Sequence, residues 1–147
     1  GFKETNENEI NIEDVDPDIF LTILQQIFRA SAISCETDFD GVLELANRLL
    51  FPGILNDVEN FLGTNELELK RSVKLRLADR YGLCSLKEHL IDSLRYKEDV
   101  DEVMESADFR FLNTETQKRI QNEKERAPPS KHAHAYHFVC GTRHAPR

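Results

Sequence analysis

The residues best suited to chemistry gather near the C-terminus, where three histidines and a cysteine lie within nine positions. They are His132, His134, His137 and Cys140. Imidazole nitrogens and a thiolate at such spacing are ligands for zinc or copper. A stable metal site also needs a rigid frame and hydrogen bonds to its ligands, and this tail offers neither. We therefore predict no metal site and no cofactor, and interpret residues 127–147 as a disordered tail. A metal-binding protein built on the tail is kept as an alternative.

Two groups of carboxylates are the other candidates for chemistry. The first is Asp14, Asp16 and Asp18, and the second lies within residues 98–102. The first group matches no calcium-binding loop, because Pro17 follows Asp16 at once and no closing glutamate is in register. Both groups stand where acidic side chains stabilise the start of a helix. We interpret them as helix caps and solvated charge.

No residue is placed as a nucleophile or general base. His89 falls beside the apolar face of an expected helix, with no acid or nucleophile spaced to act with it. The sequence contains no glycine-rich phosphate loop, no serine elbow and no cysteine–histidine signature. We therefore predict no catalytic residues, and expect a protein-interaction module and not an enzyme.

Composition limits the partners and the compartment. The 147 residues carry a net charge of -8, which repels phosphate backbones, so we expect no nucleic acid partner. Apolar runs are only a few residues long, so we expect no membrane partner. Cys35, Cys84 and Cys140 show no paired spacing, which favours a reducing, intracellular location, cytoplasmic or nuclear. Cys84 is expected to be a buried thiol, because it lies between Leu83 and Leu86.

Amphipathic helices account for most of the remaining chain. Residues 9–13 alternate between polar and apolar, which predicts a short half-buried strand. Asp16 as N-cap and Pro17 at the first position predict a helix whose apolar stripe runs to Phe28. Further helical stripes cover residues 39–50, 54–62, 69–81 and 86–94, and Ser85 begins a capping-box pattern for the last of these. A weaker stripe covers residues 100–107. A final helix capped near Thr114 is expected to be exposed or frayed.

Four of these helices form a repeat. Leu43–Arg48 and Leu75–Arg80 share the pattern Leu-x-Leu-Ala-Asn/Asp-Arg at an offset of 32 residues. The correspondence continues in three apolar pairs, namely Ile54 with Leu86, Val58 with Leu90, and Leu62 with Leu94. The sequence thus predicts two stacked helical hairpins. Two units are fewer than a solenoid needs, so we expect them to pack on another part of the protein.

The order of these parts resembles the second half of a BTB/POZ domain. The resemblance runs from Phe2 to about Ile120, and is strongest over Glu9–Phe20 and Leu75–Leu83. The stretch after Ser93 is similar to the post-BTB extension of adaptors that pair a MATH domain with a BTB domain. The implied fold is mainly α (α+β in the full family), with one short strand followed by stacked helical hairpins. The implied layout is a partial BTB/POZ domain at 1–96, a helical extension at 97–126, and the tail at 127–147.

The resemblance also implies a function. The family assembles as homodimers and commonly provides substrate adaptors for cullin-RING ubiquitin ligases, so the implied partners are a cullin scaffold and another BTB chain. Cullin-binding members carry a hydrophobic-x-Glu motif before the strand, which matches Phe2-Lys3-Glu4. An aromatic near the end of the following helix matches Phe28. Phe2, Glu4 and Phe28 are therefore the expected partner-binding residues.

The sequence departs from the family in one large respect. The opening strands of the domain, and the helical hairpin that builds much of its dimer interface, have no counterpart here. This puts dimerisation and independent folding in doubt, and predicts exposed apolar faces. The alternative is a helical-repeat scaffold or homo-oligomerisation module with no link to ubiquitin transfer, whose hairpins form a peptide groove. The recruited substrate is not indicated by the sequence.

Overall fold

The computed structural model describes residues 13–29, 32–64 and 68–129, and these residues are mainly helical. In chain order the elements are α1 (Pro17–Arg29), α2 (Phe39–Arg48), α3 (Pro52–Gly63), α4 (Arg71–Tyr81), α5 (Cys84–Asp92), α6 (Lys97–Met104), the 3-10 helix η1 (Phe109–Phe111) and α7 (Thr114–Arg126). The predicted mainly α fold is thereby confirmed for this part of the chain. The strand expected over residues 9–13 lies outside the described residues.

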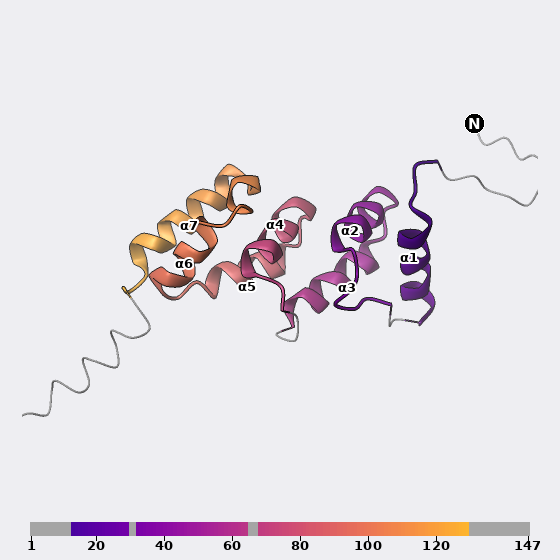
Figure 1. The fold of residues 1–147 in the computed structure, drawn as a ribbon, viewed down its shortest axis with the longest axis horizontal. Coiled ribbons are helices and arrows are strands. Elements are labelled where there is room, and N and C mark those ends of the chain that lie inside the picture. The colour runs from indigo at the N-terminus through magenta and orange to yellow at the C-terminus, as the bar shows by residue number, and fades with distance from the viewer. Residues whose placement is uncertain (1–12, 30–31, 65–67, 130–147) are drawn as a thin grey trace, which may run out of the picture.

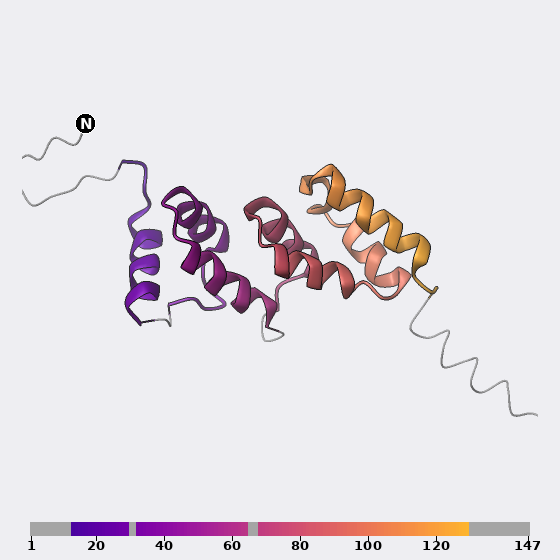
Figure 2. The same cartoon turned by 180° about the vertical axis from the view of Figure 1, so that it is seen from behind.

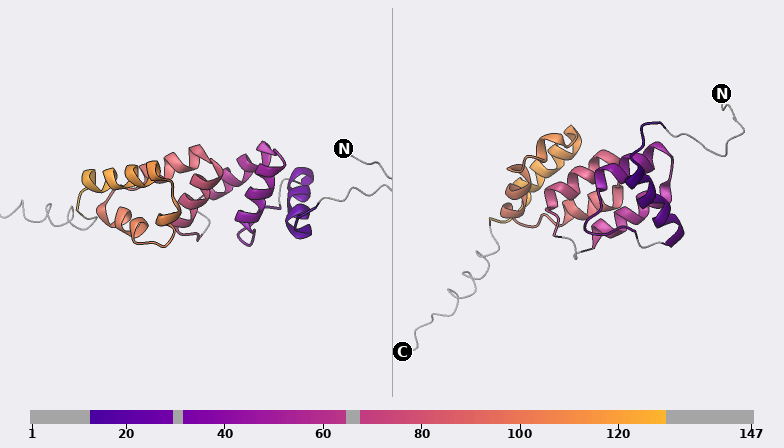
Figure 3. Two further views of the ribbon diagram at one scale, coloured as in Figure 1. Left: turned by 90° about the horizontal axis from the view of Figure 1, so that it is seen from above. Right: turned by 45° about the vertical axis from the view of Figure 1, so that its right-hand side comes forward.

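The helices stand side by side in a row that follows the chain (Figure 1). Helix α1 lies at one end and packs on α2 and α3; the hairpins α2–α3, α4–α5 and α6–α7 come next in order. The same row is seen from behind in Figure 2, and from above and obliquely in Figure 3. None of the described helices is long and apolar enough to cross a membrane.

The predicted repeat is confirmed residue by residue. Helices α2 and α4 begin at Phe39 and Arg71, and α3 and α5 begin at Pro52 and Cys84, so both pairs keep the offset of 32. Within the repeated pattern, Ala46 and Ala78 are fully buried, which lets neighbouring helices approach closely. The apolar stripes of all the hairpins join in one core cluster. The third hairpin, α6–α7, extends the row beyond the two predicted units.

Both repeated hairpins turn in the same way. The equivalent residues Leu50 and Gly82 adopt left-handed backbone angles, with φ of 56° and 70°. In each turn the next N–H donates back to an alanine carbonyl, from Phe51 to Ala46 at 2.8 Å and from Leu83 to Ala78 at 2.9 Å. This bond closes the helix end. Glycine adopts the left-handed region freely, whereas leucine does not, so the first turn is the more strained of the two.

Helix α7 is better anchored than the sequence predicts. The expectation of an exposed or frayed helix is wrong, because Ile120 is fully buried against the rest of the core. The helix is capped one residue earlier than expected, by Asn113, whose side chain accepts from the N–H of Thr116 at 2.8 Å. The guanidinium of Arg119 donates to both carboxylate oxygens of Glu88 on α5, each at 2.7 Å. One buried isoleucine and interhelical polar contacts therefore hold a mostly polar helix.

The packed region also continues past the predicted boundary of the tail. Ala127 is buried, and the carbonyl of Pro128 accepts from the N–H of Lys97 at 3.1 Å. The rest of the expected tail, including the four candidate metal ligands near its end, lies outside the described residues.

Two further predictions about α5 are wrong. The capping box at Ser85 does not form, because α5 begins at Cys84 with no side-chain cap of its own. Instead, a carboxylate oxygen of Glu59 on α3 accepts from the N–H of Leu86 at 2.8 Å. Cys84 is exposed, not buried, because the turn places Leu83 and Leu86 in the core while Cys84 faces away from it.

Candidate interaction surface

The start of α1 is fixed by the predicted cap. A carboxylate oxygen of Asp16 accepts from the N–H groups of Asp18 at 2.9 Å and Ile19 at 3.3 Å. Pro17 takes the first helical position, where no backbone donor is required. Asp16 thus caps the helix, as expected from the sequence, and Asp18 adds an acidic side chain to the first turn.

The inner side of α1 is held by apolar and polar contacts together. Ile23 is fully buried. Gln26, also buried, donates to the carboxylate of Asp57 on α3 at 3.0 Å. The amide oxygen of Gln26 accepts from the N–H groups of Ala32 at 2.9 Å and Ile33 at 3.3 Å, which fixes the chain after the helix. Helix α1 therefore has a defined orientation on the row.

The outer side of α1 is apolar and uncovered. Leu21 is 51% exposed and Ile27 is 49% exposed, two of the four large exposed hydrophobic side chains in the described residues. Helix α1 stands at the end of the row, with no other described helix on its far side (Figure 1). Exposed apolar side chains gathered on one element are typical of a protein-binding surface. We call the exposed part of α1, marked by Leu21 and Ile27, the α1 face.

The predicted partner-binding residues are only partly placed by the structure. Phe28 belongs to α1, so it lies on the same helix as the α1 face, but its side chain is outside the described part. Phe2 and Glu4 lie outside the described residues altogether. The sequence analysis did not single out Leu21, although its helical position away from Ile23 was readable from the spacing.

Acidic groups border the α1 face at its N-terminal end. Glu13, Asp14, Asp16 and Asp18 are all exposed. The segment that carries them is tied to α2, because the guanidinium of Arg48 donates to the carbonyls of Glu13 at 3.2 Å and Asp14 at 3.3 Å. The apolar face and its acidic border are therefore complementary to an apolar surface with a basic rim.

Polar contacts connect the hairpins behind this face. Arg76 on α4 donates to both carboxylate oxygens of Asp40 on α2, at 3.2 and 3.0 Å, and to Asp108 near η1 at 3.0 Å. Hydrogen bonding to Asp40 raises the pKa of the Arg76 guanidinium above its ordinary value, against the opposing effect of burial. Arg76 thus links all three hairpins through charge-assisted hydrogen bonds.

A second polar hub joins the last two hairpins. Asp79 on α4, with its side chain only 4% exposed, accepts from the N–H and the side-chain amide of Asn113, each at 2.6 Å, and from the hydroxyl of Thr116 at 2.7 Å. Lys87 on α5 donates to the same carboxylate at 3.3 Å. Asp79 therefore fixes the start of α7.

The sequence analysis missed both hubs, although a signal for them was present. At the repeat offset, Arg76 corresponds to Glu44 and Asp79 corresponds to Asn47. Helices α2 and α4 thus keep their apolar pattern but differ in charge where α4 contacts the third hairpin. His89 is exposed, and the described ranges hold no cluster of three metal-ligating side chains.

Comparison with known proteins finds similarity to a protein-interaction domain. Residues 1–66 match the family model of the BTB/POZ domain, which spans α1, α2 and α3. BTB and MATH domain-containing protein 15 of Caenorhabditis elegans is 33% identical over 86 residues, covering 58% of this chain and 31% of that protein. BTB and MATH domain-containing protein 36 of the same organism is 27% identical over 115 residues, covering 77% of this chain and 35% of that protein.

A third relative, BTB and MATH domain-containing protein 38 of Caenorhabditis elegans, is 23% identical over 116 residues, covering 79% of this chain and 30% of that protein. The chain thus spans about a third of the length of these relatives. No solved structure matches it. The chain carries, at residues 1–66, a match to the BTB/POZ domain, a protein-interaction domain, and its relatives are proteins named for their BTB and MATH domains.

Proposed function

We propose that this chain is the helical second half of a BTB/POZ domain with its post-BTB extension, acting as a substrate-adaptor piece of a cullin-RING ubiquitin ligase. The proposal keeps the layout expected from the sequence, with the partial domain at 1–96 and the extension beginning at residue 97. The family match, which ends at residue 66, supports the first part of this layout. A cytoplasmic or nuclear location belongs to the same proposal.

The α1 face is the observation that carries this proposal. It lies within the residues that match the BTB/POZ domain, its apolar side chains are half exposed, and acidic groups border it. Phe28 lies on the same helix. Aromatic and aliphatic anchors of this kind contribute most of the binding energy at protein interfaces. We therefore assign cullin binding to α1, with Phe2 and Glu4 as further contacts.

The test is a binding measurement between the full chain and a cullin N-terminal domain. Phe28→Ala and Leu21→Ala are each expected to weaken binding by about tenfold or more, as for interface anchors, and Glu4→Ala by less. Phe111→Ala is the matched control, since Phe111 is 62% exposed and belongs to η1, which joins α6 to α7 at the end of the row away from α1 (Figure 1). Binding that is absent in the unmodified chain, or that falls equally in the control, would refute the proposal.

A second candidate is self-association with no link to ubiquitin transfer. The α1 face favours it equally on chemical grounds, because an uncovered apolar face can be buried by a second copy of the same chain. Sedimentation of the full chain separates the two functions. A dimer that becomes a monomer on Leu21→Glu, with no cullin binding in either form, would favour this candidate.

A further inference from the structure

The two repeated hairpins differ at the start of their first helices. Helix α2 opens with Asp38, whose side chain accepts from the N–H of Gly41 at 3.1 Å and caps the helix. At the offset of 32 residues, α4 opens with Lys70, has no side-chain cap and has no acid in its first turn. A positive side chain at a helix N-terminus is unfavourable, because the backbone dipole there is also positive.

Positive residues also stand in the first turn of α4, at positions where α2 has neutral ones. Phe39 and Val42, both buried in the core of α2, correspond to Arg71 and Lys74 of α4. Lys74 is buried as deeply as a core residue, with 8% of its surface exposed. The sequence therefore places a lysine ammonium where the equivalent hairpin has a valine.

The ammonium of Lys74 has little compensation within the described residues. Its one hydrogen bond to a described residue goes to the carbonyl of Thr64, at 3.3 Å, and none of the described carboxylates forms an ion pair with it. Burial alone lowers the pKa of Lys74, as expected for an ammonium out of water without an anion beside it.

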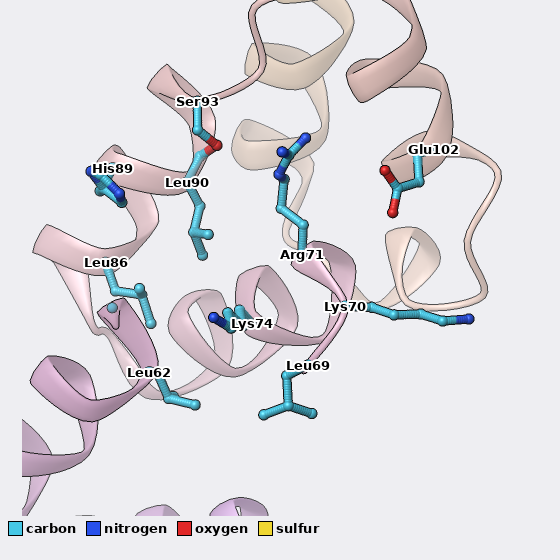
Figure 4. A pocket seen from close by; sticks show the side chains of 11 residues that line it. Leu62, Leu69, Lys70, Arg71, Lys74, Leu86, His89, Leu90, Ser93 and Glu102 are labelled. Atoms are coloured by element: carbon cyan, nitrogen blue, oxygen red, sulfur yellow. The ribbon is translucent and has the colours of Figure 1, made fainter. Parts of the chain in front are cut away.

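Lys74 lines a pocket of about 350 Å³ between α3, α4, α5 and α6. Figure 4 shows Leu62, Leu86 and Leu90 to one side of Lys74, and Arg71 with Glu102 to the other. Lys70, His89 and Ser93 are also part of the lining. The pocket thus combines apolar walls with positive groups, in a chain whose net charge is -8.

Two acidic groups limit the charge that the pocket can accept. The carboxylate of Asp99 lies 3.3 Å from the guanidinium nitrogen Nη1 of Arg71, so the two residues form an ion pair. This nitrogen is buried and makes no hydrogen bond in the described part of the chain. Glu102 lines the pocket directly and repels anions. The uncompensated charge near the apolar walls is therefore that of Lys74, which suits a single negative charge better than a doubly charged phosphate.

We propose that the Lys74 pocket binds a carboxylate side chain of a partner protein, presented on an acidic peptide segment with a neighbouring leucine-like side chain. The carboxylate pairs with the Lys74 ammonium, and the apolar side chain lies against Leu86 and Leu90. This pocket lies away from the α1 face, and the proposal does not rest on cullin binding.

The experiment uses the full chain labelled with ¹⁵N, with the peptide acetyl-Leu-Glu-Leu-amide as probe. We expect the amide resonances of residues 71–74 and 86–90 to shift with added peptide, and acetyl-Leu-Gln-Leu-amide to leave them in place. Lys74→Met keeps the apolar stem and removes the charge, and is expected to weaken binding by about tenfold or more. Lys118→Met is the matched control, since Lys118 is exposed on α7, and binding should be unchanged.

Each other outcome counts against the proposal. Equal binding of the glutamine peptide would show apolar docking without anion recognition. Shifts with inorganic phosphate but not with the glutamate peptide would show a site for a free anion. Binding that survives Lys74→Met would place the carboxylate elsewhere, and an absence of shifts at millimolar peptide would remove the site.

Discussion

The Asp79 carboxylate links the second and third hairpins, and its removal should loosen the start of α7. It lies between α4, α5 and the start of α7, and it accepts three hydrogen bonds of 2.6 to 2.7 Å. Asp79→Ala removes every one of these acceptors while leaving the helix propensity at this position favourable. The variant therefore isolates the polar link between the second and third hairpins.

The cost of Asp79→Ala can be worked out from the burial of each donor. Asn113 is exposed, so water can replace the acceptor for its two N–H groups, and their loss costs little. Thr116 is only 2% exposed, so its hydroxyl is left buried and unpaired, at about 1–3 kcal/mol. Lys87 loses an anion that is almost fully buried. The Lys87 side chain is 20% exposed, so water can compensate its ammonium, and the buried hydroxyl of Thr116 therefore sets a total loss of about 1–3 kcal/mol.

Urea denaturation followed by circular dichroism measures this loss, and hydrogen exchange locates it. The slow-exchanging amides of α7 should lose protection while those of α2 keep it, because Asp79 anchors only the third hairpin. Asn47→Ala is the matched control, since Asn47 is the repeat equivalent of Asp79 and is exposed; its effect should stay within about 0.5 kcal/mol. Equal effects of the two substitutions would refute the assignment of Asp79 as an anchor.

Three other substitutions test separate contacts. Leu50→Gly should stabilise the chain by about 1 kcal/mol in thermal melts, because it removes the strain of the left-handed backbone at a leucine that is 82% exposed. Gly82→Ala should destabilise the chain. The opposite signs would contradict the shared turn geometry. Hydrogen bonding from Arg119 lowers the pKa of Glu88. The stability from this pair is therefore present above the unfolded pKa of glutamate and is lost as the pH falls through the lower folded pKa. Glu88→Gln should reduce stability at neutral pH but not in strong acid, and a pH-independent difference would contradict the pairing. Gly41→Ala should change the melting temperature little, because the added carbon meets only the terminal Cδ1 of Ile19 on α1 and the carboxylate of the Asp38 cap, flexible ends that can shift, while alanine is the better helix former; a loss of more than about 2 kcal/mol would show that Ile19 is held rigidly against α2.

Much of the helical framework could be predicted from local patterns. The N-cap at Asp16 and the first helical position of Pro17 are set by residues within a few positions of each other, and the structure confirms both. The repeat offset of 32 residues is also confirmed, because equivalent apolar stripes pack in equivalent ways.

The errors occurred where a distant residue decides the outcome. Glu59 caps α5 from another helix, which removes any need for the local box at Ser85. Ile120 and Arg119 anchor a helix whose own sequence is mostly polar. Such contacts depend on which helices become neighbours, and one sequence read by local periodicity does not contain that information. The expected site residues Phe2, Glu4 and Phe28 stay predictions.

Arg76 should affect how easily the row of hairpins bends. In an array where each unit touches only its neighbours, bending is the sum of small rotations at the seams. Arg76 crosses two seams at once, because it holds Asp40 on one side and Asp108 on the other, and so acts as a brace that couples the two rotations. Salt weakens such ionic contacts more than it weakens the apolar seams. The curvature of the row, and hence the separation between its two ends, should therefore be stiffest at low ionic strength.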